Sequence, residues 1–403
     1  MLRFLDKKVD HSFLVNPFYI YCVAFSIAML AYLLKWSRIY PDLSPELILF
    51  FIASFILFCL LGKVFSGKIN LKFIHNQREK NNYFLNDYIF FLIIALGILN
   101  VILMGYLPVF DRSRNHLDFG IPVLDPLFNS LSIFFSVFFF QLFLLSKKRR
   151  YILYVLLLLV FNLLIFRRSA AVWIIASSVF LYILYKSRIR ILSLIVLLCL
   201  LPAFSYCFGL YGAARSNLNK SYIINELGAS DEFANSGLNQ NHYLTYLYIS
   251  SPLATLQKNI NEGKGLFNRR DLKSFVFYCL VPTSITLRLE KHLNLSPPEC
   301  SLIHPHLIAG SFLMVGFYTL GWFGMITMIV FLMLFILINF LIVRRFELFG
   351  VTTFTLLVTT VCLLTFSNFL DRLDVILMLF VYPVIFCYIY NRNWTLLRPI
   401  KRD

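Results

Sequence analysis

The sequence predicts an all-α, polytopic membrane protein with about ten transmembrane helices and one large loop on the non-cytoplasmic side. Two observations on composition predict this class: 59% of the 403 residues are hydrophobic, and only 14% are charged. In addition, apolar stretches of about 20 residues recur, and a helix of that length crosses a hydrocarbon core of about 30 Å. These stretches do not alternate in polarity, which excludes a β-barrel.

We expect a single membrane domain over residues 1–403, with both termini in the cytoplasm. The net charge is +17, and most Lys and Arg lie in short runs between apolar spans, as in cytoplasmic loops. This placement argues against nucleic acid as a partner. Ser44 and Pro45 are typical of the N-cap and first residue of a helix. The predicted spans cover residues 17–34, 45–62, 87–107, 123–146, 151–166, 169–185, 191–209, 321–343, 351–370 and 375–390.

A polar region over residues 210–306 is predicted to be the large loop. Within it, Tyr243–Leu256 and Ser274–Ile285 are apolar but too short to span a bilayer, so we expect interfacial or re-entrant segments. If these pieces cross the membrane in pairs, the number of spans becomes twelve. Residues 307–320 are predicted to form a half-helix before the span that begins at Gly321.

Two adjacent arginines, Arg167 and Arg168, lie in a tight turn between two predicted spans. The parity of crossings places this turn on the far side, where topology does not explain basic residues. Arg215 lies directly after the seventh span. Guanidinium groups stay charged and grip phosphate oxygens through paired donors, so we expect these three arginines to bind a lipid-linked diphosphate. The alternative is that their long side chains extend to lipid headgroups.

The candidates for a general base are His304 and His306, because imidazole titrates near neutral pH and can accept a hydroxyl proton. Their spacing around Pro305 does not favour a zinc pair. The sequence contains no usable nucleotide-binding motif, so we expect no cofactor and no metal. Ordinary interfacial histidines remain the alternative. Carboxylates on the same side are further candidates, and one sequence does not choose among them: Glu226, Asp231, Glu232, Glu262, Glu290, Glu299, Asp371 and Asp374.

Four segments next to the spans carry short motifs: Phe166–Ser169, Tyr211–Arg215, Tyr246–Ala254 and His304–Gly324. In these segments and in its layout, the chain resembles the Wzy-type O-antigen polymerases, also called oligosaccharide repeat-unit polymerases. The resemblance is one of topology over most of the chain, combined with weak local motifs. It differs from the related O-antigen ligases because the histidines stand too far from Gly321.

The resemblance implies a glycosyltransferase in the bacterial inner membrane that takes part in lipopolysaccharide biosynthesis. Its substrate would be oligosaccharide linked to undecaprenyl diphosphate, transferred onto a new lipid-linked repeat unit at the periplasmic face. The arginines would bind the diphosphate, and a histidine or carboxylate would deprotonate the acceptor hydroxyl. Membrane lipids and a chain-length regulator protein are the expected partners. The alternatives are an O-antigen ligase and a flippase or transporter of lipid-linked oligosaccharides.

Overall fold

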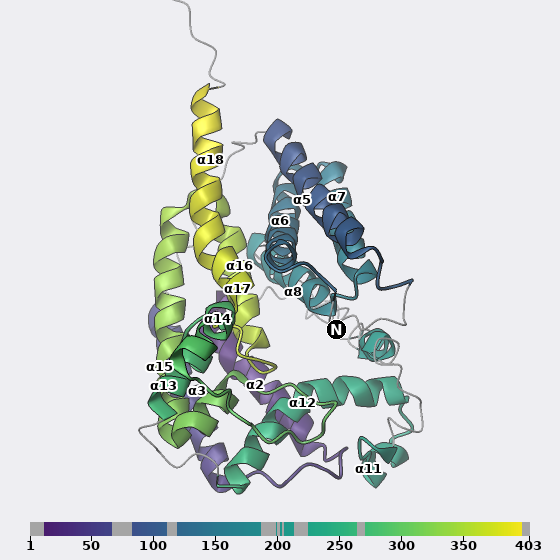
Figure 1. Cartoon of the computed structure of the whole chain (residues 1–403), viewed down its shortest axis with the longest axis vertical. Helices are drawn as coiled ribbons and strands as arrows, with labels where there is room; N and C mark the ends of the chain where they lie inside the picture. The colour runs from purple at the N-terminus through teal and green to yellow at the C-terminus, as the bar shows by residue number, and fades with distance from the viewer. Residues whose placement is uncertain are drawn as a thin grey trace, which may run out of the picture. The chain divides into compact units, whose positions relative to one another are not determined.

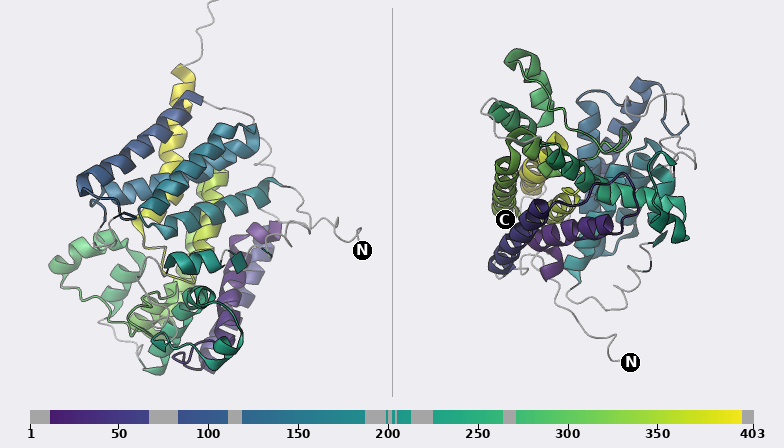
Figure 2. Two further views of the ribbon diagram at one scale, coloured as in Figure 1. Left: turned by 90° about the vertical axis from the view of Figure 1, so that its right-hand side faces the viewer. Right: turned by 90° about the horizontal axis from the view of Figure 1, so that it is seen from below.

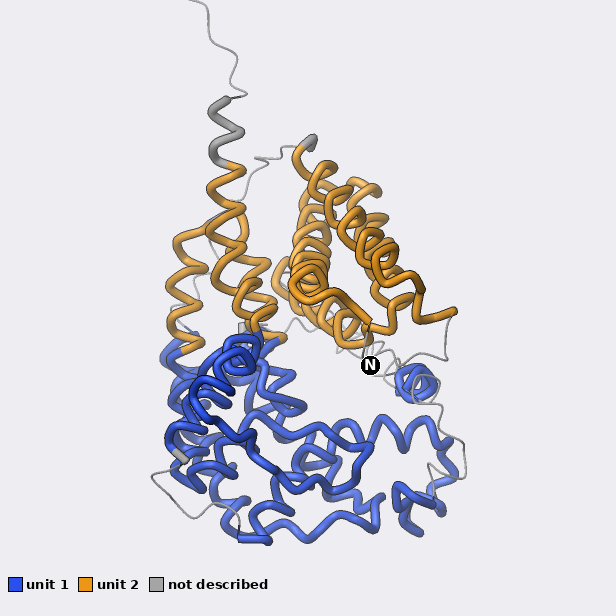
Figure 3. Tube along the Cα trace, in the orientation of Figure 1, with its two compact units in different colours: residues 1–68, 187–334, 360–372 blue, residues 69–186, 335–359, 373–403 orange. Residues whose placement is uncertain are grey.

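The structure, a computed structural model, describes residues 12–66, 83–110, 119–186, 225–263 and 271–396, with residues 199, 202–203 and 205–212. Within these ranges the chain is helical and forms no strand, apart from an isolated bridge between Ser37 and Ala229. The chain divides into two compact units (Figure 3). Unit 1 comprises residues 1–68, 187–334 and 360–372, and unit 2 comprises residues 69–186, 335–359 and 373–403.

Six of the described helical stretches are long and apolar enough to cross a membrane. They are α3 (Pro45–Ser66), α5 (Tyr83–Met104), α6 (Leu124–Ser146), α8 (Arg168–Tyr185), α15 (Phe312–Arg345) and the run of α17 (Leu373–Ile376), η4 (Leu377–Val381) and α18 (Tyr382–Leu396). Two shorter apolar helices are α2 (Pro17–Leu33) and α16 (Glu347–Leu363). This confirms an all-α chain with several candidate membrane spans. The total of about ten stays a prediction, and the seventh predicted span lies largely outside the described residues.

Helices α2 and α3 pack side by side in unit 1 (Figure 1). Asn16 is the N-cap of α2, and its side-chain amide donates to the carbonyl oxygen of Gly62 in α3 at 3.0 Å. The rings of Tyr21 and Phe58 stack between the two helices with their centroids 4.1 Å apart. The pair is therefore joined by a polar bond at one end and by aromatic packing along its length.

The predicted large loop is folded and mostly helical where the structure describes it. It contains α11 (Asp231–Asn235), α12 (Gln240–Asn261), α13 (Asp271–Phe275), the π-helix η3 (Val276–Leu280) and α14 (Thr283–Leu293). The segment Tyr243–Leu256 lies within α12, where most side chains are buried and the helix packs against α2 (Figure 1).

A buried apolar cluster joins this loop to the connection between α2 and α3. Its buried members are Leu227, Ala229, Phe233, Tyr243, Leu244, Tyr246, Leu247 and Leu307, with Trp36 and Tyr40 packed against them. The hydroxyls of Tyr40 and Ser250 are 3.1 Å apart, and the backbone N–H of Ser44 donates to Gln257 at 2.9 Å. Ser44 also accepts from Leu47 N–H at 3.3 Å, which confirms the predicted N-cap.

Helix α15 is broken at Gly321, where the half-helix prediction placed its end. Gly321 has φ 63° and ψ −146°, a conformation that side-chain-bearing residues avoid. The chain folds sharply enough here that a side chain on Gly324 would overlap the carbonyl oxygen of Gly316. The segment from Phe312 to the break is therefore a separate half-helix. Its predicted end is confirmed, whereas the predicted start at residue 307 is too early, because residues 307–311 are not helical.

Unit 2 is built around α6, which contacts α5, α7 (Arg149–Leu164) and α8 (Figure 2). Polar side chains bond across these apolar helices. Asn162 donates to Ser132 at 3.2 Å, and Thr352 of α16 donates to Gln141 at 2.6 Å. In hydrocarbon, such bonds and close packing hold helices together, because lipid tails are as apolar as the helix surfaces.

Replacing Gly321 with alanine is predicted to destabilise the protein by about 1–3 kcal/mol, because a Cβ disfavours the backbone conformation at the break. The midpoint of thermal unfolding in detergent measures this loss. Gly310→Ala is the control, because Gly310 has no positive φ and its close neighbour is the flexible Met314 side chain. Equal unfolding midpoints for Gly321→Ala and the wild type would show that the break does not require glycine.

Candidate functional site

The turn between α7 and α8 places two arginines at the end of an apolar helix pair in unit 2. Phe166 reverses the chain with a positive φ of 57°, and Arg167 then forms the N-cap of α8. The backbone N–H of Arg167 donates to the carbonyl oxygen of Asn162 at 2.9 Å. Arg168 is the first residue of α8, and both arginine side chains are half-buried.

The guanidinium group of Arg167 is held by α6. It forms an ion pair with the carboxylate of Asp125 and also donates to the backbone carbonyl oxygen of that residue at 3.3 Å. It lies 5.8 Å from the ring centroid of Phe128. The two charged side chains are only 13% and 24% exposed, so water screens this pair less than it screens a surface pair. Arg167 is therefore oriented rather than freely extended.

Asp125 is itself positioned by a second helix. The side-chain NH₂ of Asn100 in α5 donates to the carboxylate of Asp125 at 2.8 Å. The side-chain carbonyl oxygen of Asn100 accepts from the backbone N–H of Ile121 at 3.1 Å. Sequence reasoning singled out neither Asp125 nor Asn100. Two signals were available: an acid in the first turn of a predicted span, and an asparagine inside an apolar one.

The two arginines and Asp125 together leave one net positive charge at this turn. Such a site can bind a phosphate group that shares Arg167 with Asp125, because a guanidinium has five N–H donors. Arg215, the third predicted arginine, lies outside the described residues. Arg167 and Arg168 lie in one turn because they are adjacent in the sequence. The tertiary structure adds Asp125 as the partner of Arg167.

His304 and His306 lie in unit 1, on the segment that precedes the half-helix. The Nδ1 atom of His304 accepts from the backbone N–H of His306 at 3.2 Å, and the two rings stack with centroids 5.5 Å apart. Partial burial, and then the neighbouring His306, lower the pKa of His304 below 6.5. The lowered pKa keeps the His304 ring neutral at pH 7, with its proton on Nε2, because Nδ1 is the nitrogen that accepts the hydrogen bond. The lone pair that would take up a proton is therefore engaged by the backbone N–H of His306, and this bond must open before His304 can act as the predicted base.

Asp371 and Asp374 are buried, whereas the other six carboxylates that the sequence left open are not. Asp371 belongs to unit 1 and is 9% exposed. Thr283 and Asn368 hydrogen-bond to its carboxylate, and Asn368 also donates to the carbonyl oxygen of Cys279 at 3.1 Å. Burial raises the pKa of Asp371 to about 7, against the smaller opposing effects of Thr283, Arg372 and Asn368.

Asp374 lies in unit 2 and has a structural environment of its own. Its carboxylate accepts from the side-chain amide of Asn129 in α6 at 3.0 Å and from the backbone N–H of Val375 at 3.0 Å. The bond from Asn129 joins the last helical stretch to α6. Asp371 is therefore the carboxylate whose burial and hydrogen bonds suit proton transfer near pH 7, and Asp374 is the one that connects two helices.

Replacing Asp125 with asparagine is predicted to lower the free energy of unfolding by roughly 2–4 kcal/mol, because it leaves the guanidinium of Arg167 without its counter-charge in a partly buried place. Thermal unfolding in detergent measures this. Asp231→Asn is the matched control, because its ion pair with Arg38 is largely exposed and is expected to contribute little. Equal losses in the two variants would contradict an anchoring role for Asp125.

The raised pKa of Asp371 predicts that stability depends on pH. The unfolded chain ionises this carboxyl near 3.8, and the folded chain does so near 7. Between these values the folded state binds the extra proton, so its stability falls as pH rises and levels off above about pH 7.

The Asp371→Asn variant is expected to lack this decrease of stability between about pH 4 and pH 7, because asparagine does not titrate. The variant is expected to gain on the order of 4 kcal/mol over the wild type above about pH 7, and nothing near pH 4. Unfolding midpoints measured across this range test it, with the exposed Glu299→Gln as control. Parallel pH curves for Asp371→Asn and the wild type would contradict the assignment.

Comparisons with known proteins give a single result. No protein-family model, no curated protein sequence and no solved structure matches the chain. The functional conclusion therefore rests on the residues of this chain: the arginine turn of unit 2, and the histidines and buried carboxylate of unit 1.

Proposed function

We propose that the protein is an O-antigen polymerase of the bacterial inner membrane. In this proposal it transfers a growing glycan from undecaprenyl diphosphate onto a new lipid-linked repeat unit at the periplasmic face. The observation that carries the proposal is the turn at Arg167 and Arg168, where two guanidinium groups stand at the end of apolar helices and Asp125 orients one of them. Charges at such a position are costly and favour a functional role.

The proposed reaction is a glycosyl transfer between two lipid-linked substrates. A hydroxyl of the new unit attacks the anomeric carbon of the growing chain and forms a glycosidic bond. The bond from that carbon to the diphosphate oxygen breaks, and undecaprenyl diphosphate leaves with the bonding electrons. Arg167 and Arg168 would stabilise the charge that develops on the diphosphate. Arg215 is the third arginine assigned to this role by the sequence.

A base must take the proton of the attacking hydroxyl. His304 and His306 are the first candidates, and the lowered pKa of His304 favours the neutral, proton-accepting form. Asp371 is a second candidate, because its pKa of about 7 lies close to the working pH. The proposal needs one such group and no metal.

The proposed topology places both termini in the cytoplasm and the large loop in the periplasm. Its support is the distribution of basic residues. The packing of the large loop against the connection between α2 and α3 is the contact expected of two segments on one side of the membrane.

Deleting the gene is predicted to leave lipopolysaccharide core with a single repeat, because polymerisation stops while ligation continues. Electrophoresis of lipopolysaccharide measures the ladder. Loss of a ligase would instead remove every attached repeat and accumulate long lipid-linked chains. An unchanged ladder would overturn the proposal.

Complementation of the deletion strain with arginine variants tests the proposed diphosphate site. Arg167→Lys keeps a positive charge for Asp125 but loses the paired donors, so long chains should disappear while the protein level persists. Alanine variants of Arg168 and Arg215 should have the same effect, and Arg345→Ala, at the predicted cytoplasmic end of α15, is the control. Normal ladders from all three site variants would show that the diphosphate assignment is wrong.

A further inference from the structure

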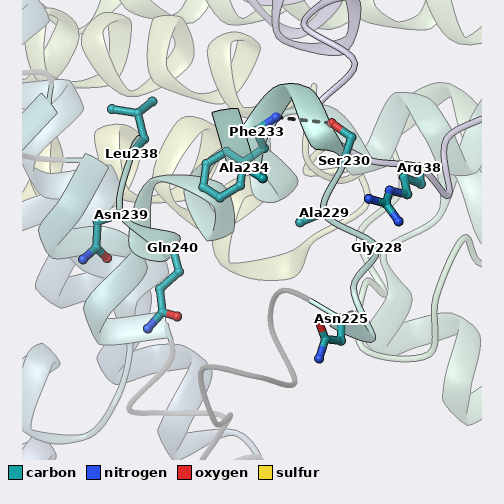
Figure 4. A pocket seen from close by; sticks show the side chains of 10 residues that line it. All are labelled: Arg38, Asn225, Gly228, Ala229, Ser230, Phe233, Ala234, Leu238, Asn239 and Gln240. Atoms are coloured by element: carbon teal, nitrogen blue, oxygen red, sulfur yellow. Dashed lines mark hydrogen bonds between the residues drawn. The ribbon is translucent and has the colours of Figure 1, made fainter. Parts of the chain in front are cut away.

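A pocket of about 690 Å³ lies in unit 1, where the connection after α2 meets the large loop (Figure 4). We infer that this pocket binds an uncharged stretch of oligosaccharide. Figure 4 shows the amides of Asn239 and Gln240 on one side and Arg38 on the other, with Asn225 below them. The volume lies within the range of about 300–1,000 Å³ that is usual for small-molecule sites.

The frame of the pocket is held by backbone bonds between segments far apart in the chain. The N–H of Arg38 donates to the carbonyl oxygen of Gly228 at 2.7 Å, and the N–H of Ser230 donates to the carbonyl oxygen of Trp36 at 2.9 Å. Phe233, which lines the pocket, is 4% exposed and packs against Trp36 in the apolar cluster. The lining is therefore built on a packed base, which fixes the backbone from which its polar side chains extend.

The polar groups that face the pocket are mainly amides with bonding capacity to spare. The side chains of Asn225 and Gln240 make no hydrogen bond to the described residues, and both line the pocket. Asn239 uses its carbonyl oxygen to cap α12, accepting from Asn241 N–H at 3.0 Å, and its NH₂ group remains as a donor. An amide offers donors and an acceptor together, as does each sugar hydroxyl, so the two match.

The charge at the pocket favours a neutral ligand over a phosphate. Among the described residues that line it, Arg38 is the one cation, and it forms an ion pair with Asp231. Glu232 lies on the same short helix and hydrogen-bonds to Ser230, which also lines the pocket. An anion would therefore meet one neutralised arginine and a nearby carboxylate. Uncharged hydroxyl groups are not repelled by this carboxylate and do not need a free positive charge.

The identity of the glycan as the repeat unit rests on the proposed polymerase function, whereas the preference for neutral carbohydrate rests on the pocket alone. The probe is the repeat-unit oligosaccharide released by mild acid from the host strain's glycan, without its phosphates. Binding is measured by calorimetry and by saturation-transfer NMR on the full chain in nanodiscs, because detergents with sugar headgroups would compete.

The Asn225→Ala/Gln240→Ala double variant is expected to bind the oligosaccharide about tenfold more weakly or worse, since two hydrogen-bonding groups are lost. Its unfolding midpoint should not change, because neither side chain bonds to the described protein. Asn235→Ala is the matched control: an exposed amide on α11 that does not line the pocket. Higher ionic strength and added inorganic phosphate should leave binding unchanged.

Wild-type affinity in the double variant, or no binding to the wild type, would overturn the inference. Competition by inorganic phosphate would do so as well, because it would identify an anion site. These outcomes are separable from those of the gene deletion. If gene deletion abolishes the ladder but the double variant binds oligosaccharide as the wild type does, the polymerase proposal stands and the assignment of the pocket as the oligosaccharide site is wrong. Selective, salt-insensitive binding with an unchanged ladder supports a carbohydrate site in a protein of another function.

Discussion

Polar groups between apolar membrane helices must find their partners within the protein, because hydrocarbon offers none. This constraint accounts for the interior of unit 2. Asn162 and Ser132, Gln141 and Thr352, and the asparagine–aspartate bond of α6 to the last helical stretch each pair one polar side chain with another. Since the surrounding surfaces are as apolar as lipid, these pairs give the helices a preferred register that hydrophobicity alone does not supply.

The same constraint explains why Arg167 is fixed. A guanidinium at the end of an apolar helix pair needs acceptors close by, and Asp125 supplies both a carboxylate and a backbone carbonyl. In our proposal, anchoring makes Arg167 both a structural element and a pre-oriented hydrogen-bond donor to phosphate, since a side chain already held in one geometry loses little entropy on binding. The lysine variant separates these two roles.

Unit 1 follows a different rule, because its large loop has a small hydrophobic core of its own. Trp36 and Tyr40 follow the C-terminal end of α2 and pack against the buried tyrosines of α12. Because of this packing, the large loop, which is polar in sequence, has a defined structure with a pocket on its surface. In our proposals the two units divide the chemistry: the arginine turn of unit 2 takes the charged lipid diphosphate, and the pocket of unit 1 takes neutral sugar.

The sequence by itself determined the all-helical class with several apolar helices long enough to span a membrane, the approximate positions of those helices, the Ser44 cap and the break at Gly321. These features depend on hydrophobic runs and on single residues with special backbone geometry, which are local properties. Only the tertiary structure decided that Asp125 is the partner of Arg167, that Asp371 is the carboxylate with a raised pKa, and that the large loop holds a pocket. Each of these depends on burial and on contacts between residues distant in the chain, which no local pattern encodes.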